Sequence, residues 1–286
     1  MSMVPRQWYE IPNLDCQQSK MSTLISATLY SAHLKLDWNY DIYLPDQLNS
    51  NQKYPLLLIL HGLYGNHTNF LDSNRIDSKP LLDELINKSH KKIIVAFVDG
   101  FNSFYIDSLS GLKLETAIIQ DLLPYLFEHY PVKEPVGIGG ISMGGYGAAR
   151  LAMKYPTLFS AAFLISPAVW KVDHVPPTIH DSIHAFQDKN HSWSANIYNQ
   201  LYPTNYLSPT SKKIKFYIET SEKDAIVRST DVIDFAHQLS NNQNQVQFKL
   251  DPFGAHNWLY WRDAIVPAYT WMIDQLGVKN NDFENQ

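Results

Sequence analysis

The sequence predicts an α/β fold with a mostly parallel central sheet and helices on both faces. Continuous apolar runs such as Pro55–Leu60 and Ile93–Val98 indicate strands buried on both sides, as the strands of parallel sheets are. Segments with helical periodicity alternate with these runs along the chain. Because neither a repeat nor a linker interrupts the alternation, we expect residues 1–286 to form a single domain.

The N-terminal half begins with an irregular, polar arm over residues 1–22. Apolar and β-favouring residues then recur near every second position from Thr23 to Leu44, which predicts two strands. After the two apolar runs already named, the periodicity predicts helices from about Lys79 to Ser89 and from near Lys113 to His129.

The best-defined motif follows, where the apolar run Val136–Ile141 leads into Gly140-Ile141-Ser142-Met143-Gly144 and then into a helical pattern. A strand that turns this sharply into a helix leaves no room for side chains beside the serine, which explains the flanking glycines. The Ser142 hydroxyl is then displayed at a helix N-terminus, where free N–H groups face developing negative charge. Ser142 is the candidate nucleophile, and the alternative is a glycine-rich turn that serves packing alone.

The C-terminal half continues the alternation. We expect strands at 161–166, 214–219 and 246–250, and helices at about 229–239 and 261–276. The stretch from about 167 to 209 lacks a strand pattern and is predicted to be a cap insertion over the carboxyl edge of the sheet. Residues 278–286 are expected to be a frayed tail.

A serine nucleophile needs a base, and the base needs an acid that fixes its tautomer. In this architecture both follow the serine, on loops after later strands. His256 follows the last predicted strand, and Asp224 follows the strand after the cap. Competing residues are less well placed, although Glu222 stays open as an alternative acid; the others are Asp231, Asp251, His174, His180, His184, His191 and His237.

The loop His61-Gly62-Leu63 leaves a buried strand upstream of the serine, where such enzymes form half of an oxyanion hole. The predicted donors are the N–H groups of Leu63 and Met143, and His61 is interpreted as support for its loop.

Three aromatic residues, Phe104, Tyr105 and Trp258, are candidates to contact substrate. They are equally compatible with plain core packing.

Composition and charge argue against several other classes of function. A net charge of −5 disfavours nucleic acid and anionic membranes as partners. Neither a membrane-spanning apolar stretch nor a signal peptide is visible, and Cys16 is the only cysteine, so we expect a cytoplasmic protein without disulfides. His180 and His184 have a metal-compatible spacing, but no acidic or cysteine pattern completes a site, so neither a metal nor a cofactor is expected.

Three motifs together resemble the esterase D-type branch of the α/β hydrolases: His61-Gly62-Leu63 with Gly65-Asn66, Gly140-x-Ser142-x-Gly144-Gly145, and Gly254-x-His256-x-Trp258-x-x-Trp261. The segment from Asn102 to Asp107, with Glu115-Thr116, is also similar. This branch includes tributyrin, feruloyl and acetyl-xylan esterases, S-formylglutathione hydrolases and mycolyltransferases. The resemblance spans roughly residues 25–276. Asn257 departs from the acidic residue found there in many relatives, but that position is not part of the triad.

The resemblance implies the α/β-hydrolase fold, with Ser142 as nucleophile, Asp224 as acid, His256 as base, and Leu63 and Met143 as oxyanion donors. The predicted activity is hydrolysis of short-chain or aromatic, hydroxycinnamoyl-type esters of small molecules through an acyl-enzyme. Alternatives are a thioesterase of the S-formylglutathione hydrolase type, an acyltransferase, and a non-catalytic scaffold used for binding.

Overall fold

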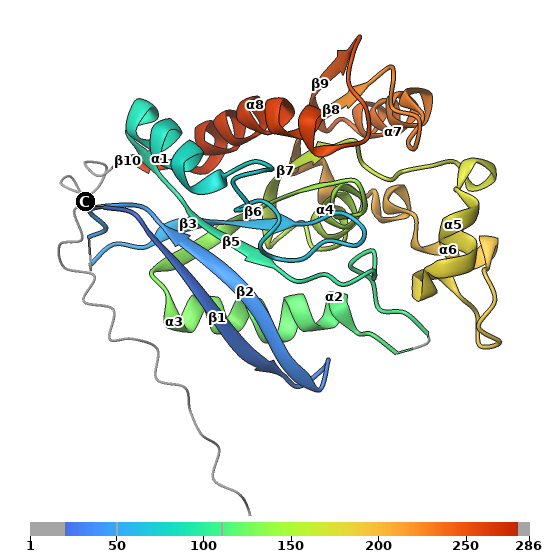
Figure 1. Ribbon diagram of the computed structural model, residues 1–286, viewed down its shortest axis with the longest axis horizontal. Helices are drawn as coiled ribbons and strands as arrows, with labels where there is room; N and C mark the ends of the chain where they lie inside the picture. Colours follow the sequence, from blue (N-terminus) through green and yellow to red (C-terminus); the bar gives the residue numbers. More distant parts are fainter. Residues whose placement is uncertain (1–20, 50, 110, 280–286) are drawn as a thin grey trace, which may run out of the picture.

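The computed structural model describes residues 21–49, 51–109 and 111–279 (Figure 1). Most of the predicted arm, including Cys16, and the last seven residues of the predicted tail lie outside these ranges. The main sheet contains strands β1 (Thr23–Ser31), β2 (Leu36–Leu44), β3 (Tyr54–Leu60), β5 (Ile94–Val98), β6 (Val132–Ile141), β7 (Phe159–Ile165), β8 (Lys215–Ser221) and β9 (Gln245–Asp251).

The strands lie in the order β1-β2-β5-β3-β6-β7-β8-β9. The first two form an antiparallel hairpin, β2 pairs antiparallel with β5, and the remaining neighbours are all parallel. All seven residues of β3 are buried, as expected for a strand covered on both faces. The predicted α/β fold with a mostly parallel central sheet is confirmed.

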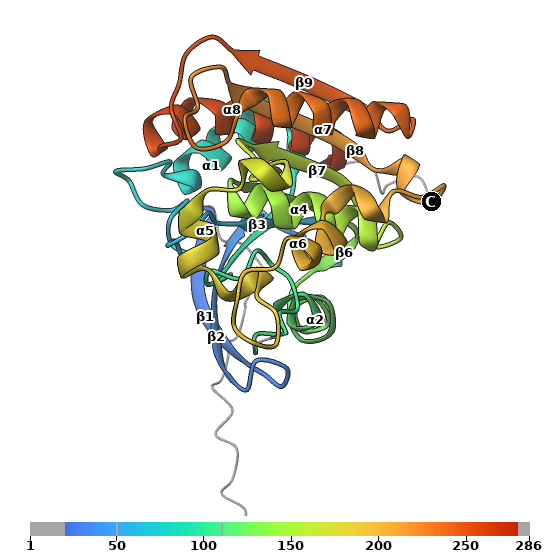
Figure 2. The same ribbon diagram turned by 90° about the vertical axis from the view of Figure 1, so that its right-hand side faces the viewer.

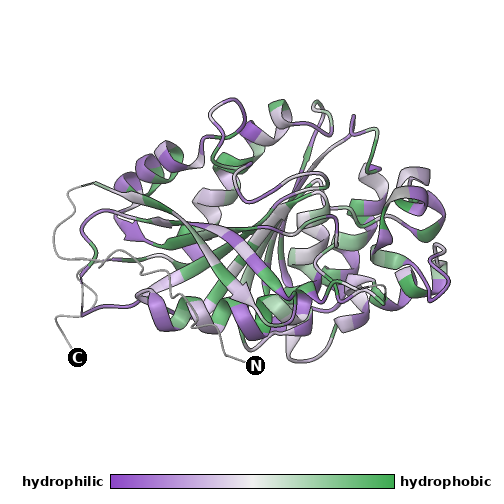
Figure 3. Ribbon diagram, turned by 60° about the horizontal axis from the view of Figure 1, so that its bottom comes forward, coloured by the Kyte–Doolittle hydropathy of each residue, from purple (hydrophilic) through white to green (hydrophobic). Residues whose placement is uncertain are grey.

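Helices cover both faces of the sheet (Figures 1 and 2). Helices α1 (Ser78–Ser89) and α8 (Trp258–Leu276) share one apolar cluster with one face. The other face packs against α2 (Leu114–Ala117), α3 (Leu123–His129), α4 (Met143–Lys154) and α7 (Ser229–Asn241). In Figure 3 the central strands are largely green, which shows how apolar the middle of the molecule is.

The helix predicted from Lys113 to His129 contains a π-helical turn, η1, at Ile118–Leu122. Pro124 follows this turn within the first residues of α3. Because proline has no N–H and its ring collides with the carbonyl one turn earlier, it disturbs the regular α-helical hydrogen bonds at this position. The wider turn accommodates the proline and lets the helix continue to His129.

The chain end also differs from the prediction. Val278–Lys279 forms strand β10, which pairs with Lys91–Lys92 (β4). The expected frayed tail therefore does not begin at residue 278. Helix α8 also begins at Trp258, three residues earlier than predicted, because the Asn257 side chain caps it by accepting a hydrogen bond from the Tyr260 N–H (3.1 Å).

Residues 167–209 form short helical pieces beyond the carboxyl ends of the central strands (Figures 1 and 2). Phe186 and Tyr198 from this segment are fully buried and contact the Tyr146 ring of α4. The pieces are α5 (Pro177–Ser182), α6 (Ala195–Leu201) and the 3-10 turns Val172–His174, His184–Phe186 and Pro203–Tyr206. Among the described residues, every helix is too short or too polar to cross a membrane.

Candidate active site

Ser142 sits at the turn between β6 and α4 in a strained conformation, with φ 56° and ψ −117°. A side chain at such a positive φ is unfavourable, so the surrounding structure must hold it. The Ser142 N–H donates to the Ile165 carbonyl (2.9 Å), and its carbonyl accepts from the Tyr146 and Ala168 N–H groups (both 3.0 Å). All three contacts fix the serine backbone between β7 and the first turn of α4.

The glycines of the motif are required by close backbone contacts. A Cβ on Gly144 would lie 2.0 Å from the Leu60 carbonyl oxygen at the end of β3. A Cβ on Gly140 would lie 2.5 Å from the carbonyl carbon of Gly144. Both distances are impossible for a real side chain, so α4 can start this close to the sheet only with glycine.

The Ser142 side chain is joined to His256 and Asp224. The Ser142 Oγ lies 2.8 Å from His256 Nε2, and His256 Nδ1 lies 2.7 Å from Asp224 Oδ2. A carboxylate accepts, so Nδ1 carries the proton and Nε2 is free to accept from the serine hydroxyl. Three loops that follow β6, β8 and β9 thus bring the three predicted residues into one hydrogen-bonded chain.

Asp224 is oriented by its backbone surroundings. Its Oδ1 accepts from the N–H groups of Ile226 and Val227 (both 2.9 Å), while Oδ2 accepts from His256. Burial alone would raise the pKa of Asp224, but the hydrogen bonds from His256 and these two N–H groups lower it below its usual range. Asp224 therefore stays ionised and favours a protonated His256 when that proton is transferred.

The alternative acids have other partners. Glu222 is exposed, although it lies only two positions before Asp224 in the sequence. Asp231 accepts from His174 Nδ1 (2.9 Å) and thereby ties the 167–209 segment to α7. Asp251 accepts from the Tyr260 hydroxyl (2.9 Å). Neither Asp231 nor Asp251 is part of the Ser142–His256 chain.

The loop after β3 lies beside the serine, since a Cβ on Gly62 would lie 3.5 Å from the Cβ of Ser142. His61 is buried and supports this loop, as predicted from the sequence. Its Nδ1 lies 2.7 Å from the Gly62 carbonyl oxygen, and its Nε2 accepts from the Gly100 N–H (2.8 Å). Leu63 follows in this loop, and Met143 is the first residue of α4.

Two of the three aromatic residues proposed to contact substrate belong to the core instead. Phe104 is fully buried against Tyr146 and Phe186. Tyr105 is also fully buried, and its hydroxyl donates to the His61 carbonyl (3.0 Å). The sequence cannot separate these roles, because core and pocket both favour aromatic side chains. Trp258 is half-buried against Phe70, so its contact with substrate stays a prediction.

The histidines of the 167–209 segment do not converge. His180 stacks on Trp193, with ring centroids 4.3 Å apart, and His184 Nδ1 lies 2.8 Å from the Gln187 side-chain oxygen. Within the described ranges, groups of three or more His, Cys, Asp or Glu side chains arranged to hold a metal ion do not occur.

The structure also adds a neighbour of His256 whose role the sequence did not reveal. The rings of Trp261 and His256 meet edge to face, with centroids 5.0 Å apart. Trp261 Nε1 in turn donates to Ser166 Oγ (3.3 Å), just after β7. The spacing Gly254-x-His256-x-Trp258-x-x-Trp261 contained this residue, but only the start of α8 shows that it faces the histidine.

Known proteins resemble this chain in sequence and in structure. It is 26% identical to the acetyl esterase of Caldicellulosiruptor saccharolyticus, over 76% of this chain and 82% of that protein. A ferulic acid esterase superposes with a TM-score of 0.75 at 22% identity, covering 91% of this chain and all of that one. A fluorophosphonate-binding serine hydrolase of Staphylococcus aureus superposes with a TM-score of 0.71 at 23% identity, covering 88% and 99%.

A family model described as "Putative esterase" matches residues 31–272, which include every element from the end of β1 into the last turns of α8. The match agrees with the predicted resemblance and spans Ser142, Asp224 and His256. The chain therefore belongs to this esterase family, with an α/β-hydrolase fold, and is a hydrolase of carboxylic esters.

Proposed function

We propose that this protein is a serine carboxylesterase that hydrolyses short-chain carboxylic esters through an acyl-enzyme on Ser142. The observation that carries the proposal is the hydrogen-bonded chain from Ser142 Oγ to His256 Nε2 (2.8 Å) and from His256 Nδ1 to Asp224 Oδ2 (2.7 Å). These are the contacts that a nucleophile, its general base and the orienting acid need before substrate binds.

In the first half of the reaction, His256 accepts the Ser142 proton while Oγ attacks the ester carbonyl carbon. The tetrahedral intermediate collapses when His256 donates that proton to the leaving alcohol, and an ester on Ser142 remains. In the second half, His256 accepts a proton from water, the hydroxide attacks the acyl carbon, and the proton returns to Ser142 as the acid leaves. Every step uses protein groups and water alone.

The oxyanion of both intermediates requires donors on the far side of the carbonyl from His256. We assign the N–H groups of Leu63 and Met143 to this role. Met143 is the first residue of α4, so its N–H is one of those left without a partner inside the helix. The loop that carries Leu63 passes beside Ser142 at Gly62.

The acyl group is proposed to be short, of the acetyl type. The acetyl esterase of Caldicellulosiruptor saccharolyticus supports this size. Phe104 and Tyr105, which could have received an aromatic acyl group, are both enclosed in the core. The hydroxycinnamoyl alternative therefore rests on Trp258 and on the fold shared with a ferulic acid esterase.

The test is hydrolysis of p-nitrophenyl esters from acetate to octanoate, together with methyl ferulate, by the wild type and by Ser142→Ala. We expect the highest kcat/KM for acetate and a large loss in the variant. Equal activity in the two proteins would exclude Ser142 as the nucleophile. Faster turnover of methyl ferulate than of acetate would exclude the short-chain assignment and leave the serine mechanism intact.

Two alternative reactions use the same residues. S-formylglutathione hydrolases from Staphylococcus aureus and Agrobacterium tumefaciens share the fold, with TM-scores of 0.68 and 0.72. Faster turnover of S-formylglutathione than of p-nitrophenyl acetate would favour the thioesterase, and acyl transfer to added alcohols would favour a transferase. A folded protein that a fluorophosphonate probe fails to label would favour a non-catalytic scaffold.

A further inference from the structure

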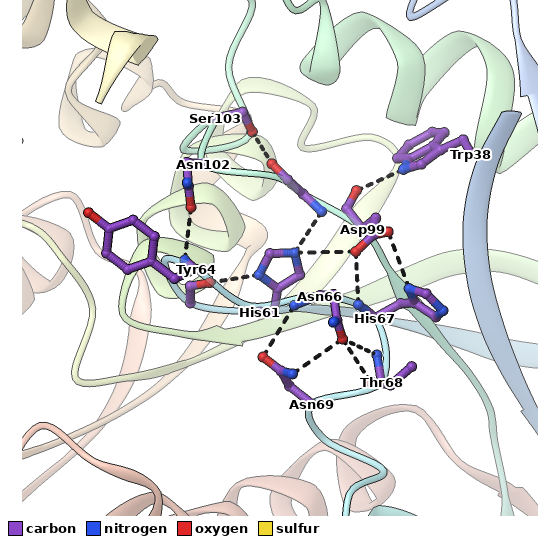
Figure 4. Close-up of polar contacts among 12 residues, drawn as sticks. Trp38, His61, Tyr64, Asn66, His67, Thr68, Asn69, Asp99, Asn102 and Ser103 are labelled. Carbon is purple, nitrogen blue, oxygen red and sulfur yellow. Dashed lines mark hydrogen bonds and ion pairs between the residues drawn. The ribbon is translucent and has the colours of Figure 1, made fainter. Parts of the chain in front are cut away.

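The loop after β3 is held by side chains that have no part in the proton transfers (Figure 4). We propose that His61 and Asn102 are positioning residues, which fix the two peptide planes on either side of Leu63 so that its N–H faces the oxyanion. The proposal rests on the proposed function, because it assumes that the Leu63 N–H is an oxyanion donor.

The first plane is the peptide between Gly62 and Leu63. The Gly62 carbonyl oxygen lies 2.7 Å from His61 Nδ1 and accepts from the Gly65 N–H (3.2 Å). In a planar trans peptide, the carbonyl and the following N–H point in opposite directions. Holding the Gly62 carbonyl toward His61 therefore directs the Leu63 N–H away from His61.

His61 can act in this way only as one tautomer. The Gly100 N–H can only donate, so His61 Nε2 accepts from it (2.8 Å) and the single ring proton sits on Nδ1. That proton is then available to the Gly62 carbonyl. Burial lowers the pKa of His61 below its usual value, which favours the neutral ring that this tautomer requires.

The second plane is the peptide between Leu63 and Tyr64. Tyr64 has a φ of 59°, which is unfavourable for a residue with a side chain, and the residue is 72% exposed. Packing of the ring therefore does not hold this conformation. The Tyr64 N–H instead donates to Asn102 Oδ1 (2.8 Å), and Figure 4 shows this contact reaching across from the loop after β5.

The loop after β5 is itself fixed. Asp99 Oδ1 accepts from the His67 N–H (3.0 Å), and the Asp99 carboxylate also lies 3.3 Å from His67 Nδ1. Asn102 thus holds the β3 loop at Tyr64, inside the Gly62–Gly65 turn, and Asp99 holds it at His67, two residues after that turn. Because the planes are set before substrate arrives, the donor needs no reorganisation during the reaction.

The first experiment replaces Asn102, whose side chain is exposed, so that folding is not at risk. Complete loss of an oxyanion donor lowers kcat about 10²- to 10³-fold, and a misdirected donor should lower it by roughly tenfold. We expect this loss in Asn102→Ala, with unchanged KM and melting temperature. Asn102→Asp retains an acceptor oxygen and should recover most of kcat.

The matched control is Asn39→Ala, which removes another exposed asparagine that accepts a side-chain hydrogen bond, from Thr28 Oγ1 (2.9 Å). It should leave kcat unchanged. Wild-type kcat in Asn102→Ala would overturn the role of Asn102, and so would an equal loss in Asn102→Ala and Asn102→Asp. If Ser142→Ala were as active as the wild type, the proposed function itself would fail. The Asn102 variants test only the position of the donor, so the two failures can be told apart.

The second experiment separates the two nitrogens of His61. His61→Asn keeps a donor near the position of Nδ1, whereas His61→Gln keeps an acceptor near that of Nε2. Both variants lose one buried hydrogen bond, so both should melt at a lower temperature. With kcat expressed per site titrated by a fluorophosphonate, His61→Asn should retain several-fold more activity than His61→Gln. Equal kcat in the two variants would overturn the positioning role of His61.

Discussion

The two ends of helix α4 carry polar groups with opposite roles, reactivity at one end and stability at the other. At its N-terminal end, the N-cap residue Ser142 has a strained φ of 56°, and its hydroxyl contacts a histidine that can accept its proton. In its last two turns, Arg150 is almost fully buried and forms an ion pair with Glu115 of α2. The N-terminal end, at Ser142, holds a group ready to react. The C-terminal end, at Arg150, holds a charge whose hydrogen-bonding partners are all in place, and we call it the engaged end.

The engaged end fastens the 167–209 segment to the helix. Arg150 donates from Nε to the Leu201 carbonyl (3.1 Å) and from a terminal nitrogen to the Tyr206 hydroxyl (2.8 Å). Glu115 is also contacted by Lys154 and by the Tyr155 hydroxyl. Removing one partner of a buried ion pair strongly destabilises the fold, because the other charge stays buried without compensation. A catalytic serine, in contrast, must keep its hydroxyl oxygen free to attack the substrate. Stability and reactivity are therefore separated along one helix.

The largest expected effect concerns the reactive end. Asp224→Asn should lower kcat/KM by about 10⁴-fold, because an amide cannot hold the His256 tautomer that accepts the serine proton. The melting temperature should change little by comparison. Ester hydrolysis and a thermal melt of the same preparation measure both quantities. A loss of less than tenfold would indicate that Glu222, two residues away, can replace the acid.

The engaged end should show the reverse. Arg150→Met removes one partner of a buried ion pair and leaves the Glu115 charge undercompensated, which should lower the free energy of unfolding by about 3 kcal/mol. The kcat of the protein that remains folded should stay within a few-fold of the wild type. Urea unfolding measures the free energy of unfolding. Ester hydrolysis divided by the number of titrated active sites measures kcat.

The control for Arg150→Met is Arg262→Met, which removes an exposed guanidinium that donates to the Asn74 carbonyl (2.6 Å). Its effect on unfolding should not exceed about 1 kcal/mol, since exposed polar contacts contribute little. Equal losses in the two variants would contradict the contrast between the ends of α4.

A smaller effect is expected from the strain at Ser142. Ser142→Gly removes the side chain that disfavours a positive φ, a strain of about 1–3 kcal/mol, partly offset by the greater freedom of glycine in the unfolded chain. The inactive variant should therefore be more stable than the wild type by on the order of 1 kcal/mol. Ser142→Ala, which keeps a Cβ, should show no such gain, and a gain in both would contradict the explanation.

The smallest effect concerns pH. Hydrogen bonding to Asp99 is the main cause that raises the pKa of His67 in the folded protein, and Asp41 adds to it. A raised pKa means that protonated His67 stabilises the fold below its unfolded pKa of about 6.5, and that this contribution disappears as pH rises through the folded pKa.

We therefore compare the free energies of unfolding of the wild type and His67→Gln at two pH values. The wild type should exceed the variant by on the order of 1 kcal/mol near pH 6, and by less near pH 9. A difference that grows toward alkaline pH would contradict the assignment. Kinetic measurements at the same pH values would show whether the β3 loop loses its position when His67 is neutral.

Much of the fold could be predicted from the chain. The apolar runs of β3 and β5 identified buried parallel strands, because a strand covered on both faces cannot alternate with polar residues. The turn at Ser142 was equally clear, since glycines at Gly140 and Gly144 are needed wherever backbone meets backbone. The π-helical turn before Pro124 and the short strand at Val278–Lys279 were not predicted, because each depends on a local fit that periodicity does not record.

For the candidate site, the sequence by itself determined which residue types could form a nucleophile, a base and an acid, and on which loops they lie. Only the tertiary structure decided that Asp224 rather than Glu222 contacts His256, and that Phe104 and Tyr105 fill the core. It also decided that Asn102 reaches Tyr64 across 38 positions of the chain. Spacing limits which residues can meet, but packing fixes where each side chain points, and packing depends on every neighbouring element at once.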